Sequence, residues 1–207
     1  MRKVIIVEGK QDTEFIKALA PTLEVKSIEI KELGGAGKSH LEKLQSPLQA
    51  LKNDNAINPI EKIGILLDLD PKDFTVESRL AFVNESVEKV FGVKLLDTSV
   101  FQQVSDSSIQ ITCYFIKPNL DVLLRKIASK PSPSADCLYR CLETQANIGQ
   151  KEKDKAWPLY YMRWDICDAK ERRKGLENVS FKCTDTKEAW NLSALLLEDL
   201  KTFLSLF

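Results

Sequence analysis

Carboxylates follow two short apolar runs in this chain. ILLDLD (65–70) ends in Asp68 and Asp70, and the run KVIIV (3–7) is followed directly by Glu8. In an extended chain, side chains two residues apart lie on the same face, roughly 7 Å apart. Acids gathered at one place repel one another and are costly to desolvate unless a cation lies between them. Because Mg²⁺ binds one or two carboxylates together with water and substrate phosphate, the pattern indicates metal-assisted phosphoryl transfer.

Each of these positions also has a plain structural interpretation. Asp68 and Asp70 precede Pro71, and an Asp where a strand emerges into water commonly begins a turn. Gly9 suits either an ordinary turn or the close approach of a ligand to the backbone. Lys10 is either a phosphate contact or a solvated charge. The residue types alone leave these alternatives open.

The elements that must position the carboxylates alternate between strands and helices. Continuous apolar runs predict buried strands, and apolar residues at helical spacing predict amphipathic helices. This alternation predicts an α/β fold with a central, mostly parallel sheet flanked by helices. The expected strands are 3–7, 26–33, 62–70 and 109–116; the expected helices start at Asp12, after the glycines of 34–37, at 75 and at 120, and a last one covers 188–207.

The second half of the chain is less regular. Proline and serine predict a loop over 130–136, and the charges of 150–155 predict a solvated helix start or loop. We expect a first domain over 1–128 and an α-rich C-terminal extension over 129–207, packed on it.

Parallel strands place their carboxyl ends at one edge of a sheet, where ligands bind. If the strands 3–7 and 62–68 are neighbours, about 4.8 Å apart, Glu8 and the two aspartates converge at that edge. The sequence therefore predicts that these strands are parallel neighbours and that the three acids share one crevice.

Composition bounds the classes of protein. The 207 residues are 43% hydrophobic and 29% charged, as in ordinary globular domains, and the net charge of zero argues against bulk attraction to nucleic acid. No apolar run is long enough to span a bilayer, so we expect no membrane partner. The odd number and irregular spacing of the 5 cysteines favour reduced, structural thiols in a cytoplasmic protein. A single histidine, His40, argues against zinc or histidine chemistry.

Three segments together resemble a known family. VEGKQDTEFI (7–16), LGG (33–35) and LLDLD (66–70) resemble the Toprim fold of topoisomerases, bacterial primases and small nucleases. Within that superfamily the chain is most similar to small standalone Toprim-like proteins of the DUF3226 type. The resemblance implies that the aspartates bind Mg²⁺, with Mn²⁺ as a substitute. It also implies that Glu8 acts as general acid or base or joins a second metal. The simplest reaction for such a site is hydrolysis of a nucleic-acid phosphodiester, and the sequence does not distinguish DNA, RNA or a nucleotide as substrate.

The glycine-rich segment GGAGKS (34–39) fails the nucleotide-binding pattern because Glu32 stands where the first glycine is required. A glycine turn that opens a helix can still hold a phosphate through backbone N–H groups. Gly34, Gly35 and Lys38 are therefore candidate substrate-binding residues, as are Gly9 and Lys10.

Two other functional classes stay open. One is a noncatalytic interaction module that keeps the fold and binds a protein partner. The other is a phospho-receiver domain, which ends a strand in an Asp followed by Leu-x-x-Pro, similar to Asp68 with Leu69 and Pro71 here, and later carries a Lys-Pro pair like Lys117-Pro118. The aromatic cluster WPLYYMRW (157–164) either packs a domain or stacks nucleobases, and packing is the commoner use.

Overall fold

The computed structural model describes residues 1–23, 25, 27–33, 40–70, 74–172 and 186–207. The chain forms two compact units, Met1–Asn119 with Asp199–Phe207, and Leu120–Glu198. The first unit thus ends earlier than the expected boundary at residue 128, and the end of the chain belongs to it.

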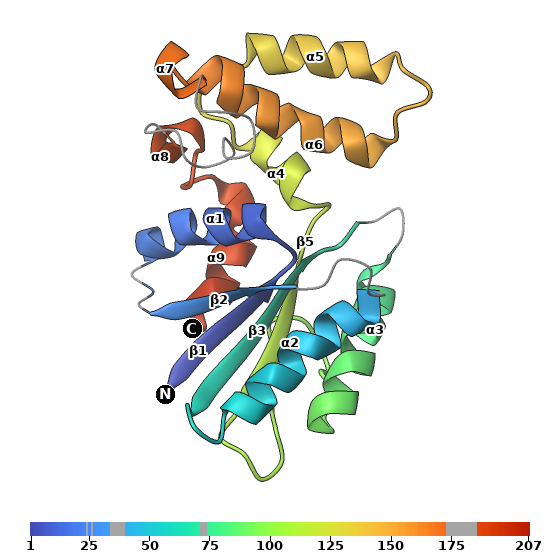
Figure 1. The fold of residues 1–207 in the computed structure, drawn as a ribbon, viewed down its shortest axis with the longest axis vertical. Coiled ribbons are helices and arrows are strands. Elements are labelled where there is room, and N and C mark those ends of the chain that lie inside the picture. Colours follow the sequence, from blue (N-terminus) through green and yellow to red (C-terminus); the bar gives the residue numbers. More distant parts are fainter. Residues whose placement is uncertain (24, 26, 34–39, 71–73, 173–185) are drawn as a thin grey trace. The chain divides into compact units, whose positions relative to one another are not determined.

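The first unit is built on a five-stranded sheet in the order β2-β1-β3-β5-β4 (Figure 1). All neighbouring strands are parallel except the short β4, which pairs antiparallel with β5. The predicted mostly parallel sheet is therefore confirmed, as is the neighbouring position of the first and third strands. The strands are β1 (Arg2–Val7), β2 (Ile28–Glu32), β3 (Ile60–Asp68), β4 (Gln102–Gln103) and β5 (Gln110–Ile116).

Helices cover both faces of this sheet, which is why its strands read as continuous apolar runs. Figure 1 shows α2 and α3 together on one side of the sheet, and α9 on the other. Leucines of α2 and valines of α3 pack with alternate residues of β1 and β3 in one apolar core. The helices of this unit are α1 (Lys10–Leu19), which continues into a 3₁₀ turn (Ala20–Leu23), α2 (His40–Asp54), α3 (Val76–Phe91) and α9 (Glu198–Ser205).

Local sequence explains where these helices begin and end. Thr75 caps α3, since its Oγ1 accepts the N–H of Ser78 at 3.2 Å, and Gly92 ends it with φ of 72°. Asp12 does not start α1 as expected. The helix begins at Lys10, and Asp12 in its first turn accepts the Gly9 N–H at 3.1 Å. Pro47 lies inside an uninterrupted α2.

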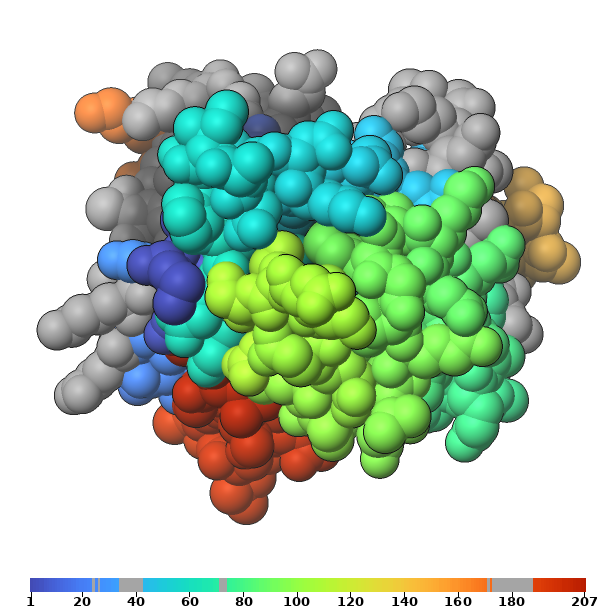
Figure 2. Space-filling view, turned by 90° about the horizontal axis from the view of Figure 1, so that it is seen from below, coloured from blue at the N-terminus to red at the C-terminus, as the bar shows by residue number. Residues whose placement is uncertain are grey.

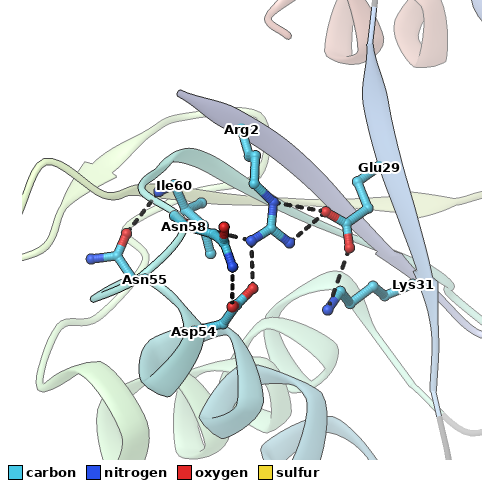
Figure 3. A network of polar contacts seen from close by, with 7 residues as sticks. All are labelled: Arg2, Glu29, Lys31, Asp54, Asn55, Asn58 and Ile60. Atoms are coloured by element: carbon cyan, nitrogen blue, oxygen red, sulfur yellow. Dashed lines mark hydrogen bonds and ion pairs between the residues drawn. The ribbon is translucent and has the colours of Figure 1, made fainter.

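A polar network ties the amino ends of the strands together (Figure 3). Arg2 donates from Nε to Glu29 at 3.0 Å and also pairs with Asp54 at the end of α2. Asp54 accepts from Asn58, and the Asn55 side chain accepts the N–H of Ile60 at 2.7 Å, where β3 begins. This network lies at the opposite edge of the sheet from Glu8 and Asp68, so its role is structural.

The second unit is helical. Its helices are α4 (Leu120–Lys126), α5 (Pro133–Glu143), α6 (Gln150–Tyr160), α7 (Ala169–Arg172) and α8 (Thr186–Ala189), with a π-helical turn (Tyr161–Ile166) after α6 and a 3₁₀ turn (Leu195–Leu197). The rings of Trp157 and Tyr161 are stacked with their centroids 4.9 Å apart, and the ring centroids of Tyr161 and Trp190 lie 5.1 Å apart. Trp157 and Tyr161 are buried, so packing is their role, whereas Tyr160 and Trp164 stay 40% and 46% exposed.

Two element predictions in this region are wrong. The expected loop 130–136 contains the start of α5, because Pro133 takes the first helical position and Asp165 accepts the N–H groups of Ser134 and Ala135 at 3.0 Å. The expected helix 188–207 is broken after α8. There the Asn191 side chain accepts the Ser193 N–H at 3.1 Å, a local turn that competes with the helix.

The cysteines also differ in part from expectation. Cys113, Cys137 and Cys141 are free thiols, but Cys167 is disulfide-bonded. The prediction of reduced thiols throughout is therefore wrong for Cys167.

Candidate active site at the carboxyl ends of β1 and β3

The site begins where β1 leaves the sheet. The residues before Glu8 are fully buried from Val4 to Val7, so the chain can expose a polar side chain only after the strand ends. Val7 pairs with Leu66 of β3, which places Glu8 next to Asp68. The Glu8 Oε1 atom accepts the backbone N–H of Asp68 at 3.1 Å. We refer to Glu8, Asp68 and Asp70, which stand at or just after the carboxyl ends of β1 and β3, as the carboxylate edge.

Asp68 and Asp70 have different backbone conformations. β3 ends at Asp68, which pairs with Ile116 of β5. Asp70 has φ of 49°, in the left-handed region, and its N–H donates to Pro118 O at 2.9 Å. The expected strand to residue 70 therefore stops at Asp68. Side chains two residues apart share a face only in an extended chain, so the left-handed Asp70 is not held on the same face as Asp68 by strand geometry.

The structure adds Arg79, which sequence reasoning missed. Its Nη2 donates to Glu8 Oε1 at 2.6 Å, and its side chain is 6% exposed against 30% for Glu8. The guanidinium lies over the rings of Phe74 and Phe82, with 4.6 and 5.4 Å between its Cζ and the ring centroids. A signal for it existed, because Arg79 stands four residues before Val83 on the apolar stripe of α3, where a charge needs a partner.

The other candidate residues are placed in part. Gly9 precedes α1 with φ of −165°, which any residue adopts, and an added Cβ would meet nothing nearer than Asp12 Oδ2 at 3.9 Å. A glycine is therefore not required there by conformation or by crowding. Lys10 is exposed in the first turn of α1. Gly34, Gly35 and Lys38 lie outside the described residues.

Whether the acids of the carboxylate edge could hold a metal ion depends on how they are grouped, and the two oxygens of Glu8 differ in their partners. Within the described part of the chain, no group of three or more His, Cys, Asp or Glu side chains is close enough to hold a metal ion. Glu8 Oε1 is held by Arg79 and by the Asp68 amide, while Oε2 has no partner among the same residues. Carboxylate oxygens are of the donor type that Mg²⁺ takes, but the described residues show no group of acids gathered around one cation position.

Comparison with known proteins gives one match. The family model for DUF3226, described as a protein of unknown function, covers residues 2–207. The chain belongs to the DUF3226 family. The match includes both units, so the helical unit is part of the DUF3226 protein and not an unrelated attachment. No curated protein and no solved structure matches the chain. Among the helices described for this DUF3226 member, none combines the length and apolar character that crossing a bilayer requires.

Proposed function

We propose that this DUF3226 chain is a Toprim-type protein whose carboxylate edge binds Mg²⁺ or Mn²⁺ and hydrolyses nucleic-acid phosphodiesters. The observation that carries the proposal is the hydrogen bond from the Asp68 N–H to Glu8 Oε1 at 3.1 Å. It joins the carboxyl ends of two parallel strands, the position where open α/β sheets bind their ligands. The resemblance of VEG, LGG and DLD to the Toprim motifs supports the same assignment.

Each acid has a separate task in this proposal. Asp68 and Asp70 would hold the cation, because their carboxylates are the oxygen donors that Mg²⁺ prefers. Such a cation, when bound, stabilises charge on a phosphoryl oxygen and lowers the pKa of a bound water. Glu8 would accept or donate the proton through Oε2, the oxygen that Arg79 does not hold. Lys10 and the segment with Gly34, Gly35 and Lys38 would contact phosphates.

The proposal also covers the binding partner and the cellular compartment. The net charge of zero favours weak binding to nucleic acid by the chain alone, or assembly with a protein partner. A cytoplasmic location belongs to the same proposal, and the disulfide of Cys167 is the observation against it, since such bonds are rare in that compartment.

A noncatalytic module is the second candidate, and the Glu8–Arg79 ion pair favours it. A carboxylate that is already paired at 2.6 Å to a buried arginine can serve folding alone. Removal of either partner would then leave an uncompensated charge.

The experiment that separates these classes is a cleavage assay on single- and double-stranded DNA and RNA with Mg²⁺ or Mn²⁺. Asp68→Ala should lose both metal binding and cleavage. Glu8→Gln should lose 10²–10⁴-fold in rate, the usual contribution of acid–base catalysis, while it still binds the cation. Asp106→Asn, an exposed acid in the turn after β4, is the control and should cleave like the wild type.

Other outcomes would identify the rival classes. A receiver domain would form an acyl phosphate at Asp68 with small phosphodonors and would cleave nothing. A noncatalytic module would do neither. Wild-type protein that neither binds nor cuts any of the four nucleic acids would defeat the nuclease proposal.

A further inference from the structure

The helical unit exposes two aromatic side chains one turn apart. Tyr160 ends α6, and Trp164 lies in the π-helical turn that follows it. Residues four apart on a helix are neighbours on its surface, so both side chains belong to one side of this segment. Trp157 and Tyr161 of the same segment are buried, whereas Tyr160 and Trp164 are not, so packing does not account for this second pair. π-helical turns are rare and occur frequently at functional sites.

Two arginines contact the ring of Trp164. The Cζ atoms of Arg163 and Arg172 lie 5.4 and 5.5 Å from its centroid, and Arg172 Nη1 donates to the Trp164 carbonyl at 3.4 Å. Arg172 belongs to α7, which follows the π-helical turn in the chain (Figure 1). A guanidinium within about 6 Å of a ring centroid is attracted to the ring face. Trp164 therefore holds two positive charges together on the surface of the helical unit.

Neither arginine has an acidic partner among the residues that the structure describes. The acids nearest in the chain bind backbone groups instead. Asp165 accepts two N–H groups at the start of α5, both at 3.0 Å, and Asp168 accepts the N–H of Lys170 at 2.8 Å. Two guanidinium groups held side by side without a carboxylate favour a ligand that carries negative charge.

The combination of rings and guanidinium groups fits single-stranded nucleic acid. A guanidinium binds a phosphate group through two parallel hydrogen bonds. Unpaired bases stack on aromatic rings and on guanidinium planes, whereas a duplex hides the faces of its bases. The Tyr160 side chain has no hydrogen bond and no ring or cation contact in the described part of the chain, so its exposed ring is available to a base.

We propose that Tyr160, Arg163, Trp164 and Arg172 form a binding surface for single-stranded nucleic acid. Phosphate groups lie against the two arginines, and a base stacks on Tyr160. This inference goes beyond the proposed function, because it assigns ligand binding to the helical unit and requires neither a metal ion nor cleavage. A surface with only two positive charges, on a chain of net charge zero, binds weakly and loses its ligand as salt is added.

Binding of a fluorescein-labelled oligothymidylate, measured by anisotropy over a series of salt concentrations, tests the inference. EDTA is present throughout, so that no divalent cation at the carboxylate edge contributes. Tryptophan fluorescence gives a second signal, because Trp157 and Trp190 are each 2% exposed and Trp164 is the tryptophan that an oligonucleotide can reach. The variants are Tyr160→Ala, Trp164→Phe, Arg163→Gln and Arg172→Gln, each checked for folding by circular dichroism.

Two further variants are matched controls. Arg140→Gln removes the charge of an exposed arginine of the same unit that has no ring contact in the described structure. Leu159→Ala removes an exposed apolar side chain next to Tyr160, which a protein partner would bury but which cannot stack on a base. Both controls should bind the oligonucleotide like the wild type.

The wild type should bind the single strand more tightly than a duplex of equal length, and binding should quench Trp164. Tyr160→Ala should weaken binding about fivefold or more, the usual effect of one stacked base. Arg163→Gln and Arg172→Gln should each reduce the slope of log K against log salt concentration by about 0.7, the value for one phosphate contact. Trp164→Phe should bind nearly as well as the wild type, because phenylalanine still offers a ring to the arginines, but without the quenching.

The inference fails in several recognisable ways. No binding by the wild type at low salt and about 10⁻⁴ M protein, where even nonspecific binding is detected, would overturn it and leave the cleavage proposal to its own assay. Equal losses in Arg140→Gln and Arg172→Gln would show diffuse attraction in place of a site. Full binding by Tyr160→Ala would exclude stacking there. Self-association of the wild type that Leu159→Ala abolishes, without oligonucleotide binding, would make this surface an interface between copies of the chain.

Discussion

Gly64 and Phe207 are packed so closely that a side chain would not fit between them. A Cβ added at Gly64 would lie 2.6 Å from Phe207 Cζ and 3.2 Å from Phe203 Cζ. Gly64 lies in the middle of β3, so the aromatic end of the chain rests directly on the sheet backbone. Lys3 and Lys62 add hydrogen bonds to the carbonyl groups of Phe207 and Leu206. Figure 2 shows this red C-terminal segment beside a yellow-green part of the chain. The ring centroids of Phe101 and Phe207 lie 5.6 Å apart.

Gly64→Ala should therefore destabilise the protein. Overpacking of a tight core costs about 1–3 kcal/mol, which urea unfolding measures. Gly149→Ala is the matched control, because a Cβ there meets nothing nearer than Glu152 Oε2 at 3.7 Å. Its effect should stay below about 1 kcal/mol, the usual loss at a helix cap. Equal effects of the two substitutions would contradict the close contact.

Arg2→Gln should reduce the loss of stability in acid. The hydrogen bond from Arg2 lowers the pKa of Asp54; burial raises the pKa of Glu29, but the hydrogen bond and charge of Arg2, with the charge of Lys31, outweigh it and lower that pKa. Lowered carboxyl pKa values stabilise the fold above their unfolded values, near 4, and that stability is lost as the pH falls through the folded values.

The measurement is the melting temperature of wild type and Arg2→Gln at pH 7 and at about pH 3. The drop between these conditions should be smaller in Arg2→Gln. Lys94→Gln, which removes an exposed pair with Glu88, is the control and should behave like the wild type. If Arg2→Gln shows the full wild-type drop, the network does not account for the acid sensitivity.

Asp70→Asn should raise the melting temperature of the metal-free protein and reduce any gain on addition of Mg²⁺. The substitution removes the charge of Asp70, which the proposed function places together with those of Glu8 and Asp68, and Asn tolerates the left-handed φ of 49°. The gain from a bound ion is about 2.7 kcal/mol at a hundredfold excess over its dissociation constant. Asp106→Asn is the control, since Asp106 has φ of 55° outside the carboxylate edge.

Asp70→Ala separates charge from conformation at the same position. It also removes the charge, but alanine in the left-handed region costs about 1–2 kcal/mol. Asp70→Ala should therefore melt below Asp70→Asn. Clear destabilisation by Asp70→Asn in the metal-free protein would mean that Asp70 is a structural turn residue.

Thiol reactivity should distinguish Cys113 from the cysteines of α5. Burial raises the pKa of the Cys113 thiol to about 12, and the charge of Asp97 adds to the shift, so hardly any thiolate forms at pH 8. Cys137 and Cys141 are exposed. Brief iodoacetamide labelling followed by peptide mass mapping should modify Cys137 and Cys141 and leave Cys113 intact until the protein is denatured. Rapid labelling of Cys113 would show that β5 opens readily.

Periodicity predicted the parallel strands of the sheet and most of its helices, but it missed the short β4 (Gln102–Gln103). Runs such as KVIIV are apolar at every position because helices cover both faces, and this pattern identified β1, β3 and β5. The sequence was less informative for the second unit. There Leu195 and Leu196 are 87% and 58% exposed, whereas Leu197 is buried, so the leucines near the end of this unit do not form one buried helical stripe.

The amino-acid sequence by itself determined which acids end the strands and therefore which edge of the sheet they share, because parallel strands all point the same way. It did not determine that Arg79 pairs with Glu8, that Asp70 turns into the left-handed region, or that the chain end rests on Gly64. These features join residues far apart along the chain or depend on a contact with the next strand. Local patterns carry no information on such contacts, so only the packing of the folded chain decides them.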